Sequence, residues 1–454
     1  MAKVTFQSGD SRVTAACGIV AELNDAGFPT LFAGGCVRDL LLGRPLKDID
    51  IATAALPDQI EAFFPGQTVA VGKAFGVIVV LRGGHSFDVA TFRTDGAYAD
   101  GRHPQGVTYA TVKDDALRRD FTVNGLFCVA ENGEVIDYVG GVADLGARVI
   151  RAIGEPEARF REDRLRMLRA VRFASVLEFE IDSATWAAIQ AHPDWLTSVS
   201  AERIATEFVR MLCESPRPSR GLNLLRESGL LAQFMPEVAA LHGTRQPPQF
   251  HPEGDVWTHT CLMLDDLPAP RQPELALAVL LHDIGKPATF CEQAVPESGG
   301  TRIRFPNHAP VGAAMVEQLL QRLRQPTARI EAVKALVAGH MQFVEADKMR
   351  RAKLRRFLGA REFPDMLELM RLDIRYSNND FTTWRFLKEA FESFRAEPVL
   401  PEPLARGRDL VSWGVEPGPE LGRLLDELYD AQLEGRITSA EDARAFVFRG
   451  RSCS

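Results

Sequence analysis

The sequence predicts an α+β protein in which a strand-bearing head is followed by an all-helical body. Before Ile153, short apolar runs alternate with glycine-rich turns, a pattern typical of strands. The four clearest runs are PTLFAGG, DIDIA, GVIVVLRGG and HSFDVATFR, at 29–35, 48–52, 76–84 and 85–93. The segment VRDLLLG, which follows the first run, is predicted to form a helix. From about Pro156 the pattern changes to long amphipathic stretches, and no strand pattern is evident after Ile153.

The composition is that of a globular protein without a membrane segment. The chain has 454 residues, of which 46% are hydrophobic and 25% are charged. No apolar stretch is long enough to span a bilayer, and the amino end lacks the pattern of a secretion signal. The seven cysteines include no CxxC pair, so we expect neither a disulfide framework nor a zinc knuckle, and a cytoplasmic location. With a net charge of -8, any site for a polyanion must be a local basic patch.

Two aspartates in the second run, Asp48 and Asp50, are candidate metal ligands. Because side chains alternate along an extended chain, both carboxylates are predicted to lie on the same face. Two like charges held together need a cation, and Mg²⁺ prefers such oxygen ligands and leaves positions open for phosphates. A solvated strand edge is the alternative, and the spacing alone does not decide between the two.

The segment GGCVRD, upstream of these acids, has the features of a phosphate site. Gly34 and Gly35 lie between an apolar strand and a helix, where backbone N–H groups can meet a phosphate, and Arg38 adds positive charge. A tight turn between strand and helix would explain the glycines as well. In the neighbouring run, Asp88 can complete a metal site or pair with Arg93.

These segments together resemble the class II tRNA nucleotidyltransferases and bacterial poly(A) polymerases, within the DNA polymerase β superfamily. The stretch GGCVRDLLLGRPLKDIDIAT carries the first part of the resemblance. It continues in the family's order through RRDFTVNG, IDYVGGVADL and RFREDRLRMLRAVRFA, at 118–125, 136–145 and 159–174. The resemblance covers at least residues 30–180 and implies a polymerase β-like nucleotidyltransferase head.

The resemblance also implies roles for individual residues. Asp48 and Asp50 are the implied catalytic ligands of Mg²⁺, and Asp88 is the third implied catalytic carboxylate. The implied nucleotide-binding residues of the head are Gly34, Gly35 and Arg38 at the triphosphate, and Arg119, Asp120 and Asn124 near the ribose. Two positions depart from the pattern, because Gly125 stands where Ala is common and Asp88 where Glu is frequent, which leaves the third carboxylate's role open.

Between 159 and 172, helical spacing predicts that Asp163, Arg166 and Arg169 lie on one side of a helix, and Arg172 extends the row. An arginine fork and a carboxylate can together read the Watson–Crick edge of a base. An ion pair on a solvated helix is the alternative, which the residues alone favour. EDRLR, however, resembles the family's EDxxR motif, whose Asp and Arg accept C or A and reject G and U. By this resemblance Asp163 and Arg166 select the base, with Arg169 and Arg172 near the nucleotide.

Histidines with acids nearby gather in one stretch of the body. Imidazoles and carboxylates from separate helices can converge on a divalent metal, although a lone histidine on an apolar face is usually structural. The arrangement resembles the HD phosphohydrolase superfamily, whose metal ligands are matched by His259, His282, Asp283 and Asp373. His308 and His340 fall where further ligands occur in many HD domains, whereas Ala309 stands where an acid is often seen. The resemblance implies a second divalent metal here. Such a domain is either a hydrolytic centre or a relic that contributes only to packing.

The resemblances and the shifts in composition divide the chain into four parts. These are a nucleotidyltransferase head at 1–145, a helical neck with nucleotide-selecting and RNA-binding helices at 146–245, an HD-type metal-binding domain at 246–385 and a helical tail at 386–454. Between Asp347 and Glu362, seven basic residues occur without an acid, which fits either a phosphate contact or a solvated helix face. No OB or RRM pattern is present, so we expect a structured RNA to be bound through shape and phosphates.

For the whole chain, the resemblance implies an enzyme that adds CMP and AMP from CTP and ATP to the 3′ end of tRNA without a nucleic-acid template. An enzyme that adds only A, or a poly(A) polymerase, is the alternative within the same chemistry. The family-like segment RTDGAYADGRHP, at 93–104, disfavours an enzyme limited to CC. From a different class, an HD metallophosphohydrolase with an RNA-binding head is disfavoured by the DxD and RRD motifs. The oligomeric state is left open.

Overall fold

The computed structural model describes residues 2–6, 9–70, 72–95, 107–249, 251–295, 300–394 and 399–451. These residues form two compact units. The first comprises Met1–Ala239 with Pro268–Arg271, and the second Ala240–Leu267 with Gln272–Ser454. Most of the segment RTDGAYADGRHP lies outside the described residues.

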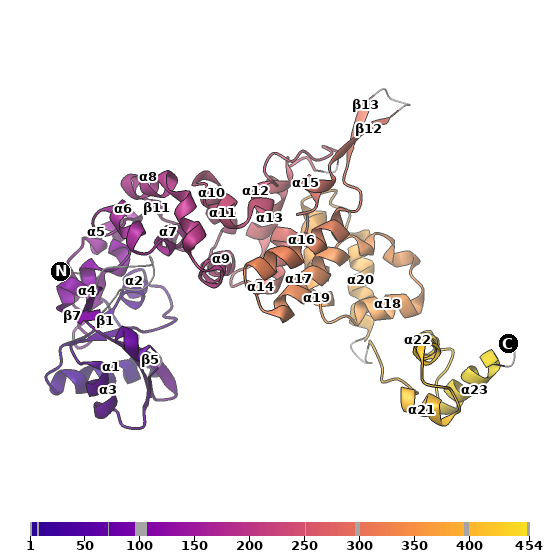
Figure 1. Cartoon of the computed structure of the whole chain (residues 1–454), viewed down its shortest axis with the longest axis horizontal. Helices are drawn as coiled ribbons and strands as arrows, with labels where there is room; N and C mark the ends of the chain where they lie inside the picture. Colours follow the sequence, from indigo (N-terminus) through magenta and orange to yellow (C-terminus); the bar gives the residue numbers. More distant parts are fainter. Residues whose placement is uncertain are drawn as a thin grey trace. The chain divides into compact units, whose positions relative to one another are not determined.

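A seven-stranded sheet, in the order β3-β4-β5-β2-β1-β8-β9, is the centre of the first unit (Figure 1). Its strands are β1 (Thr30–Ala33), β2 (Ile51–Thr53), β3 (Thr68–Val69), β4 (Val77–Arg82), β5 (His85–Thr91), β8 (Leu126–Cys128) and β9 (Val135–Asp137). Strand β2 pairs in parallel with β5, whereas the other neighbours in this sheet are antiparallel. Each of the four apolar runs in the sequence therefore contains a strand, and all residues of β1 and β2 are buried.

Helices surround and follow this sheet in the first unit. They are α1 (Ser11–Asp25), α2 (Gly35–Leu41), α3 (Pro57–Phe63), α4 (Val112–Leu117), α5 (Gly141–Ala147), α6 (Pro156–Glu162), α7 (Leu165–Leu177), α8 (Ser183–Ala191), α9 (Ala201–Glu214), α10 (Pro218–Glu227), α11 (Leu230–Phe234) and α12 (Pro236–Ala239). Two short pairings, β6 (Arg93–Asp95) with β7 (Val107–Tyr109) and β10 (Val149–Ile150) with β11 (Glu180–Ile181), complete the unit. The helix predicted after the first run is α2.

The motif IDYVGG forms the turn that leads into α5. The carboxylate of Asp137 accepts hydrogen bonds from the backbone N–H groups of Val139, Gly140 and Gly141 at 3.0, 2.9 and 3.1 Å. It also accepts one from Val142 at 2.9 Å. A side chain at Gly141 would place its Cβ 2.2 Å from the carbonyl oxygen of Thr122. One carboxylate thus satisfies the donors at this helix start, and the motif has a structural role.

The long helix predicted between 159 and 172 is broken. Helix α6 ends at Glu162 and α7 begins at Leu165, and Asp163 between them has extended backbone angles, φ -138° and ψ 103°. The Asp163 carboxylate accepts a hydrogen bond at 3.2 Å from the backbone N–H of Leu165, the first residue of α7. Asp163 and Arg166 therefore do not lie one turn apart on the same helix. The prediction from helical spacing was wrong on this point.

The second unit is mainly helical (Figure 1). Its helices are α13 (Val256–Asp266), α14 (Pro273–Leu281), α15 (Lys286–Thr289), α16 (His308–Arg322), α17 (Thr327–Gly339), α18 (Arg351–Leu358), α19 (Phe363–Arg375), α20 (Thr382–Ser393), α21 (Gly407–Ser412), α22 (Pro419–Leu433) and α23 (Ala440–Arg451). It also contains an antiparallel pair of strands, β12 (Cys291–Val295) with β13 (Gly300–Arg304). The expectation that no strand follows Ile153 was therefore wrong for this hairpin and for β11.

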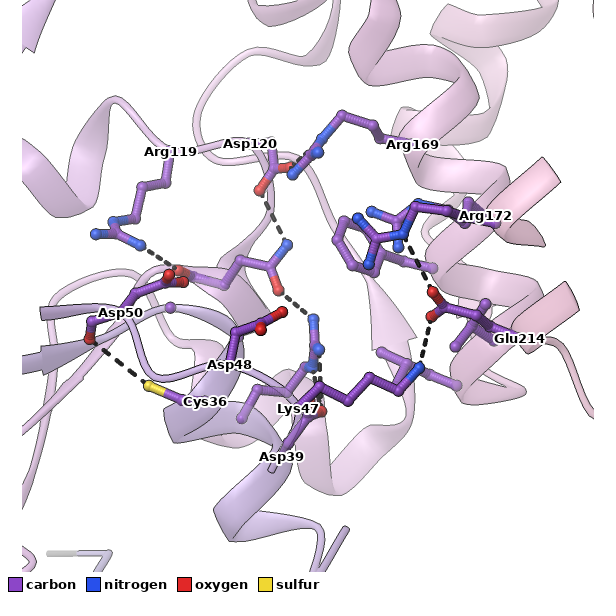
Figure 2. Close-up of a pocket in the computed structure, with 18 of the residues that line it drawn as sticks. Cys36, Asp39, Lys47, Asp48, Asp50, Arg119, Asp120, Arg169, Arg172 and Glu214 are labelled. Carbon is purple, nitrogen blue, oxygen red and sulfur yellow. Dashed lines mark hydrogen bonds and ion pairs between the residues drawn. The ribbon is translucent and has the colours of Figure 1, made fainter. Parts of the chain in front are cut away.

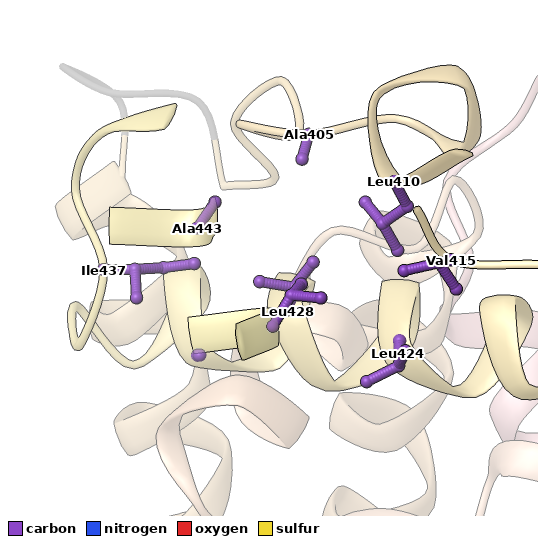
Figure 3. Close-up of a cluster of buried hydrophobic side chains, with 9 residues drawn as sticks. Ala405, Leu410, Val415, Leu424, Leu428, Ile437 and Ala443 are labelled. Carbon is purple, nitrogen blue, oxygen red and sulfur yellow. The ribbon is translucent and has the colours of Figure 1, made fainter. Parts of the chain in front are cut away.

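The last three helices have a hydrophobic cluster of their own (Figure 3). Leu410, Val415, Leu424 and Leu428 are buried there, and Val447 of α23 closes the cluster. The predicted α+β class is confirmed, with a sheet-bearing head followed by mainly helical parts. The division into four parts stays a prediction. No helix in the ranges that the structure describes has the length and apolar character needed to cross a membrane.

Candidate functional site

A cleft of about 560 Å³ opens in the first unit and is lined mainly by charged side chains (Figure 2). Nine of its lining residues are basic and six are acidic. The lining includes the candidate residues Gly34, Gly35, Arg38, Asp48, Asp50, Arg119, Asp120, Asn124, Asp163, Arg166, Arg169 and Arg172. Residues from across the first 172 positions of the chain therefore meet at one opening, where an anion would find an excess of positive charge.

Asp48 and Asp50 both point toward the open centre of the cleft (Figure 2). They are exposed, whereas Ile49 between them is buried. The carbonyl oxygen of Asp50 accepts a hydrogen bond from the backbone N–H of Ala33 in β1, at 3.0 Å. The two acids precede β2 rather than lying in it, since that strand begins at Ile51. Even so, the backbone is extended enough that the predicted alternation places both carboxylates on one face.

The surroundings of Asp50 favour a bound cation. Its pKa is raised, first because the walls of the open cleft shield the carboxyl group in part from water, and further because the negative charges of Asp88 and Asp48 lie near it. Asp88 comes from β5, where Val89 pairs with Ile51 of β2, so the pairing of the strands brings this third acid close. Asp88 is not among the residues that line the cleft. A carboxylate whose acidic neighbours raise its pKa belongs to a donor set that fits a hard divalent ion.

Gly34, close to these acids, is favoured by its backbone conformation and by a nearby arginine. Gly34 has φ +72°, a left-handed value that favours glycine, and a Cβ there would lie 2.6 Å from Arg119 Nη1. Arg119 is held by Asp115, whose carboxylate accepts from its Nη2 at 2.9 Å, and by the carbonyl oxygen of Asn124 at 3.3 Å. Because position 34 has no side chain, the fixed Arg119 guanidinium can lie directly against this turn.

A chain of hydrogen bonds connects the residues predicted to lie near the ribose. Asn124 accepts from Arg38 Nη1 at 2.6 Å and donates through Nδ2 to Asp120 at 3.0 Å. Asp120 accepts in turn from Arg169 Nε at 2.9 Å (Figure 2). Burial by itself would raise the pKa of Asp120, but the Arg169 guanidinium and the Asn124 amide lower it to about 2. The carboxylate is therefore charged at neutral pH and fixes the arginine.

The two residues predicted to select the base have other partners than each other. Asp163 accepts from Arg203 Nη2 at 2.8 Å, and Arg166 donates from Nη1 to Glu162 at 2.8 Å. Arg166 Nη2 also donates to the carbonyl oxygen of Arg118, at 3.0 Å. The alternative of a surface ion pair between Asp163 and Arg166 is therefore wrong: Arg166 is buried, and both residues face the cleft.

A second set of ligand atoms lies in the second unit. His259 of α13 has its Nε2 atom 3.2 Å from a carboxylate oxygen of Asp373 in α19. His282, which ends α14, has its Nε2 3.1 Å from Asp283. Ligand atoms of His259, His282 and Asp373 lie within 4.8 Å of one another. The Nε2 atoms of both histidines are buried and have no hydrogen-bond partner among the described residues, an arrangement that fits a divalent metal.

Asp283 connects this group to a further one. Ligand atoms of Asp283, His308 and His340 also lie within 4.8 Å of one another. His308 begins α16 and His340 ends α17, and their Nε2 atoms are 3.2 Å apart. Burial and the nearby His282 lower the pKa of His340 to about 4, so its imidazole is neutral and able to act as a ligand at pH 7.

Sequence reasoning missed Glu253, which supports His259, and His251, which contacts Glu253 in turn. Glu253 accepts from His259 Nδ1 at 2.8 Å and from His251 Nδ1 at 2.9 Å. A carboxylate behind a histidine fixes the ring so that the opposite nitrogen, here Nε2, faces the metal. The acid lies six residues before the histidine in a loop, so no helical or strand spacing in the sequence indicated it.

Three family models match the chain in succession. They describe a poly A polymerase head domain at residues 30–151, a probable RNA- and SrmB-binding site of polymerase A at 178–241, and an HD domain at 255–373. The order agrees with the resemblances seen in the sequence, and the first model covers the sheet together with Asp48, Asp50 and Asp120.

The CCA-adding enzyme of Enterococcus faecalis is 40% identical to the chain over 342 residues, which cover 70% of this chain and 80% of that protein. The chain belongs to the CCA-adding enzyme family. The CCA-adding enzyme of Geobacillus thermodenitrificans is 46% identical over 225 residues, or 49% of this chain and 55% of that protein. The chain thus spans about half the length of several curated relatives that it matches.

A solved structure of the family supports the same fold over almost the full length. The crystal structure of the Bacillus stearothermophilus CCA-adding enzyme in complex with CTP is 28% identical and has a TM-score of 0.73. The match covers 97% of this chain and 98% of that one. The predicted polymerase β-like head and HD domain are thereby confirmed as the fold. Divalent metal use is expected for both.

Gly125, which departs from the family's usual Ala, is explained by its neighbours. A Cβ at this position would lie 2.7 Å from Val139 Cγ2 and 3.2 Å from Ile153 Cδ1. The backbone there has a φ of -88°, which any residue adopts, so the restriction comes from packing. The larger side chains at 139 and 153 fill the space that an alanine methyl group would need.

Sequence reasoning also missed several cleft residues, namely Arg44, Lys47, Arg118, Phe173, Arg210 and Glu214. The guanidinium groups of Arg38, Arg169 and Arg172 lie 5.2, 5.3 and 4.1 Å from the centre of the Phe173 ring. The Phe173 ring therefore packs against three guanidinium groups in the cleft wall. For Arg210 and Glu214 a signal did exist, because they follow a helical spacing along α9.

The basic run after Asp347 is only partly free to bind RNA. Arg355 is buried and donates to the carbonyl oxygen of Val399 at 2.9 Å. Arg356 donates to Asp430 of α22 at 2.8 Å. Two of the seven basic residues therefore hold parts of the second unit together, and RNA contact by the other five stays a prediction.

Proposed function

We propose that this protein adds CMP and AMP from CTP and ATP to the 3′ end of tRNA, without a nucleic-acid template, in the cytoplasm. The observation that carries the proposal is the single cleft in which paired carboxylates, basic side chains and the Asp163 and Arg166 side chains meet. The names of its relatives support it, and so does the CTP complex of the Bacillus stearothermophilus enzyme.

The cleft residues divide the work of phosphoryl transfer. Asp48 and Asp50, with Asp88 nearby, would hold Mg²⁺. When bound, two such ions lower the pKa of the terminal hydroxyl of the acceptor and stabilise the leaving pyrophosphate. Arg38, which Asn124 fixes, would bind the triphosphate oxygens, and Arg119, which Asp115 fixes, would lie near the ribose.

Asp163 and Arg166 are proposed to read the base. An ionised carboxylate only accepts hydrogen bonds, so it favours the amino groups of C and A over the carbonyl oxygens of U and G. Arg166 donates two hydrogen bonds from Nη1 and one from Nη2. Its Nε–H donates none to the residues that the structure describes. That edge is available for a ring nitrogen or carbonyl oxygen of the base.

The decisive experiment offers tRNAs that end before CCA, after C and after CC, each with CTP or ATP alone. A CCA-adding enzyme extends the first two with CTP and the third with ATP. An enzyme that adds only A uses the third tRNA alone, and a poly(A) polymerase continues past a single A. These products distinguish the alternatives on one sequencing gel.

We infer a second, metal-dependent phosphohydrolase activity in the second unit, because the buried Nε2 atoms of His259 and His282 converge with the Asp373 carboxylate and form no well-oriented hydrogen bond among the described residues. His259, His282, Asp283 and Asp373 would hold the ion, which would supply a nucleophilic hydroxide for phosphoester cleavage. The test is hydrolysis of a 2′,3′-cyclic phosphate with and without added divalent metal. A protein that binds no metal and hydrolyses nothing would show that the cluster only packs.

A further inference from the structure

Helix α9 presents a row of four charged side chains, each of which contacts a residue of the cleft or another member of the row. Arg203, Glu207, Arg210 and Glu214 are spaced by four, three and four residues, which places them along one face of a helix. The last, Glu214, forms an ion pair with Lys47 at 3.0 Å and accepts from Arg210 at 3.2 Å. Lys47 directly precedes Asp48, so the row reaches the segment that carries the paired acids.

The contact at the other end of the row involves Asp163. Arg203 Nη2 donates to Asp163 Oδ2 at 2.8 Å, and the backbone N–H of Leu165 donates to Oδ1 at 3.2 Å. Each carboxylate oxygen therefore has one donor and keeps a lone pair for another. The side chains of Arg203 and Asp163 are only 26% and 18% exposed, so solvent screens this contact less than it screens a surface pair.

Asp163 needs such a support because its backbone does not supply one. It lies in the break between α6 and α7, where its own backbone is extended and belongs to neither helix. The Leu165 N–H fixes one oxygen, but the carboxylate can still turn about that bond. The charge-assisted bond from Arg203 fixes the second oxygen and with it the plane of the group.

We propose that Arg203 is a positioning residue that sets base selectivity by holding the Asp163 carboxylate in one orientation, an inference that rests on the proposed reading of the base by Asp163. A fixed acceptor meets the amino group of C or A directly and faces the carbonyl oxygen of U or G with a like partial charge. A carboxylate that turns or retracts admits a water, which can bridge to either kind of base edge.

The rest of the row supports the arginines beside Asp163. Glu207 is buried and accepts from Arg169 Nη1 at 3.3 Å and from Arg172 Nε. Arg203 and Glu207 thus contact three of the four candidate residues between 163 and 172, although both lie more than thirty positions away in the sequence. Because Glu207 acts on arginines and Arg203 on the acceptor group, a defect in discrimination is expected mainly from Arg203.

The test measures kcat/KM for CMP, AMP, UMP and GMP addition by Arg203→Ala and Arg203→Lys variants of the full chain. For Arg203→Ala we expect addition of CMP and AMP to fall by about tenfold to a hundredfold. Discrimination against UMP and GMP should fall by about tenfold. Arg203→Lys, which keeps a charged donor, should recover part of both. Arg329→Ala is the matched control, since Arg329 also pairs with a carboxylate, Glu274 at 2.8 Å, in the second unit and outside the cleft lining.

A double-mutant cycle with Asp163→Ala separates positioning from a general structural role. If Arg203 acts through Asp163, the double variant discriminates no worse than Asp163→Ala alone. Independent, additive losses would overturn the inference, as would an Arg203→Ala enzyme of unchanged discrimination beside an Asp163→Ala enzyme that has lost it. If Asp163→Ala itself keeps full discrimination, the proposed reading of the base fails instead. Should Arg203→Ala not fold, the same cycle with Arg203→Lys gives the same decision.

Discussion

The two candidate sites of this protein differ in how far their metal-ligating side chains are exposed to solvent. In the cleft of the first unit Asp48 and Asp50 are exposed, and the arginines around them are held by other side chains. In the second unit the ligand histidines are buried, and two of them leave an Nε2 atom without a hydrogen-bond partner in the described ranges. An open pair of acids suits ions that come and go with the nucleotide, whereas a buried set of imidazoles and carboxylates suits a resident metal.

The largest effect is expected at the open site. Asp50→Asn should lower addition of both CMP and AMP by about a thousandfold or more, because one ligand charge is lost at the reacting phosphate. Metal bound by the second unit should not change, as measured by elemental analysis of the dialysed protein. Asp58→Asn, at an exposed acid paired with Lys73, is the control. Nucleotide addition retained within about tenfold would contradict the assignment of Asp50.

The opposite result is expected for the buried site. His282→Ala should remove the metal of the second unit and metal-dependent hydrolysis of a 2′,3′-cyclic phosphate, while addition of CMP and AMP stays normal. Circular dichroism would verify that the helices remain. Loss of nucleotide addition in a well-folded His282→Ala protein would show that the two sites are coupled, against the comparison drawn above.

Arg166→Ala tests whether the cleft reads the base. Since a desolvated site would lose a charged donor, CMP and AMP addition should fall by about tenfold to a hundredfold. Misincorporation of UMP and GMP should rise relative to CMP and AMP. Arg161→Ala is a suitable control, because Arg161 is 64% exposed and pairs with Glu157 on the surface. Unchanged efficiency and unchanged selectivity would leave the base-reading proposal without support.

Glu253→Ala sharpens the description of the buried site. The His259 ring would lose the acceptor that fixes its Nε2, so affinity for Co²⁺, followed by its visible absorption, should fall by about tenfold to a hundredfold. Glu253→Gln keeps an acceptor oxygen and should lose less. An equal affinity in all three proteins would mean that Glu253 only stabilises the loop before α13.

The smallest effect concerns stability and the buried Asp120. Its pKa is lowered from the ordinary 3.8 to about 2, so its charged form stabilises the folded state above about pH 4. This contribution, about 2 kcal/mol, is lost as the pH falls toward 2. Calorimetry should therefore find Asp120→Asn less stable than the unchanged protein at pH 7, with a difference that shrinks toward pH 3. A difference that does not depend on pH would contradict the role of the Arg169 pair.

The sequence predicted what depends on local pattern or on family motifs. The runs that contain β1, β4 and β5, the shared face of Asp48 and Asp50, and the convergence of His259 with Asp373 all follow from spacing or resemblance. The break at Asp163 was missed because a hydrogen bond from Leu165, which periodicity does not show, outweighs the helical pattern there. Arg203, Glu207 and Glu253 were missed because their contacts connect segments whose proximity only the folded chain defines.

The tight packing at Gly125 has an evolutionary consequence. Because a methyl group at this position would lie 2.7 Å from Val139 Cγ2, an alanine can enter only if the residue at 139 becomes smaller or shifts. Positions 125 and 139 should therefore vary together among homologues, with a small residue at one wherever the other is larger. A lineage that started from the common alanine at 125 would have passed through one of two unfavourable intermediates. Glycine at 125 with a small residue at 139 leaves a cavity, and alanine at 125 with valine at 139 gives a clash, unless both codons changed within a short interval.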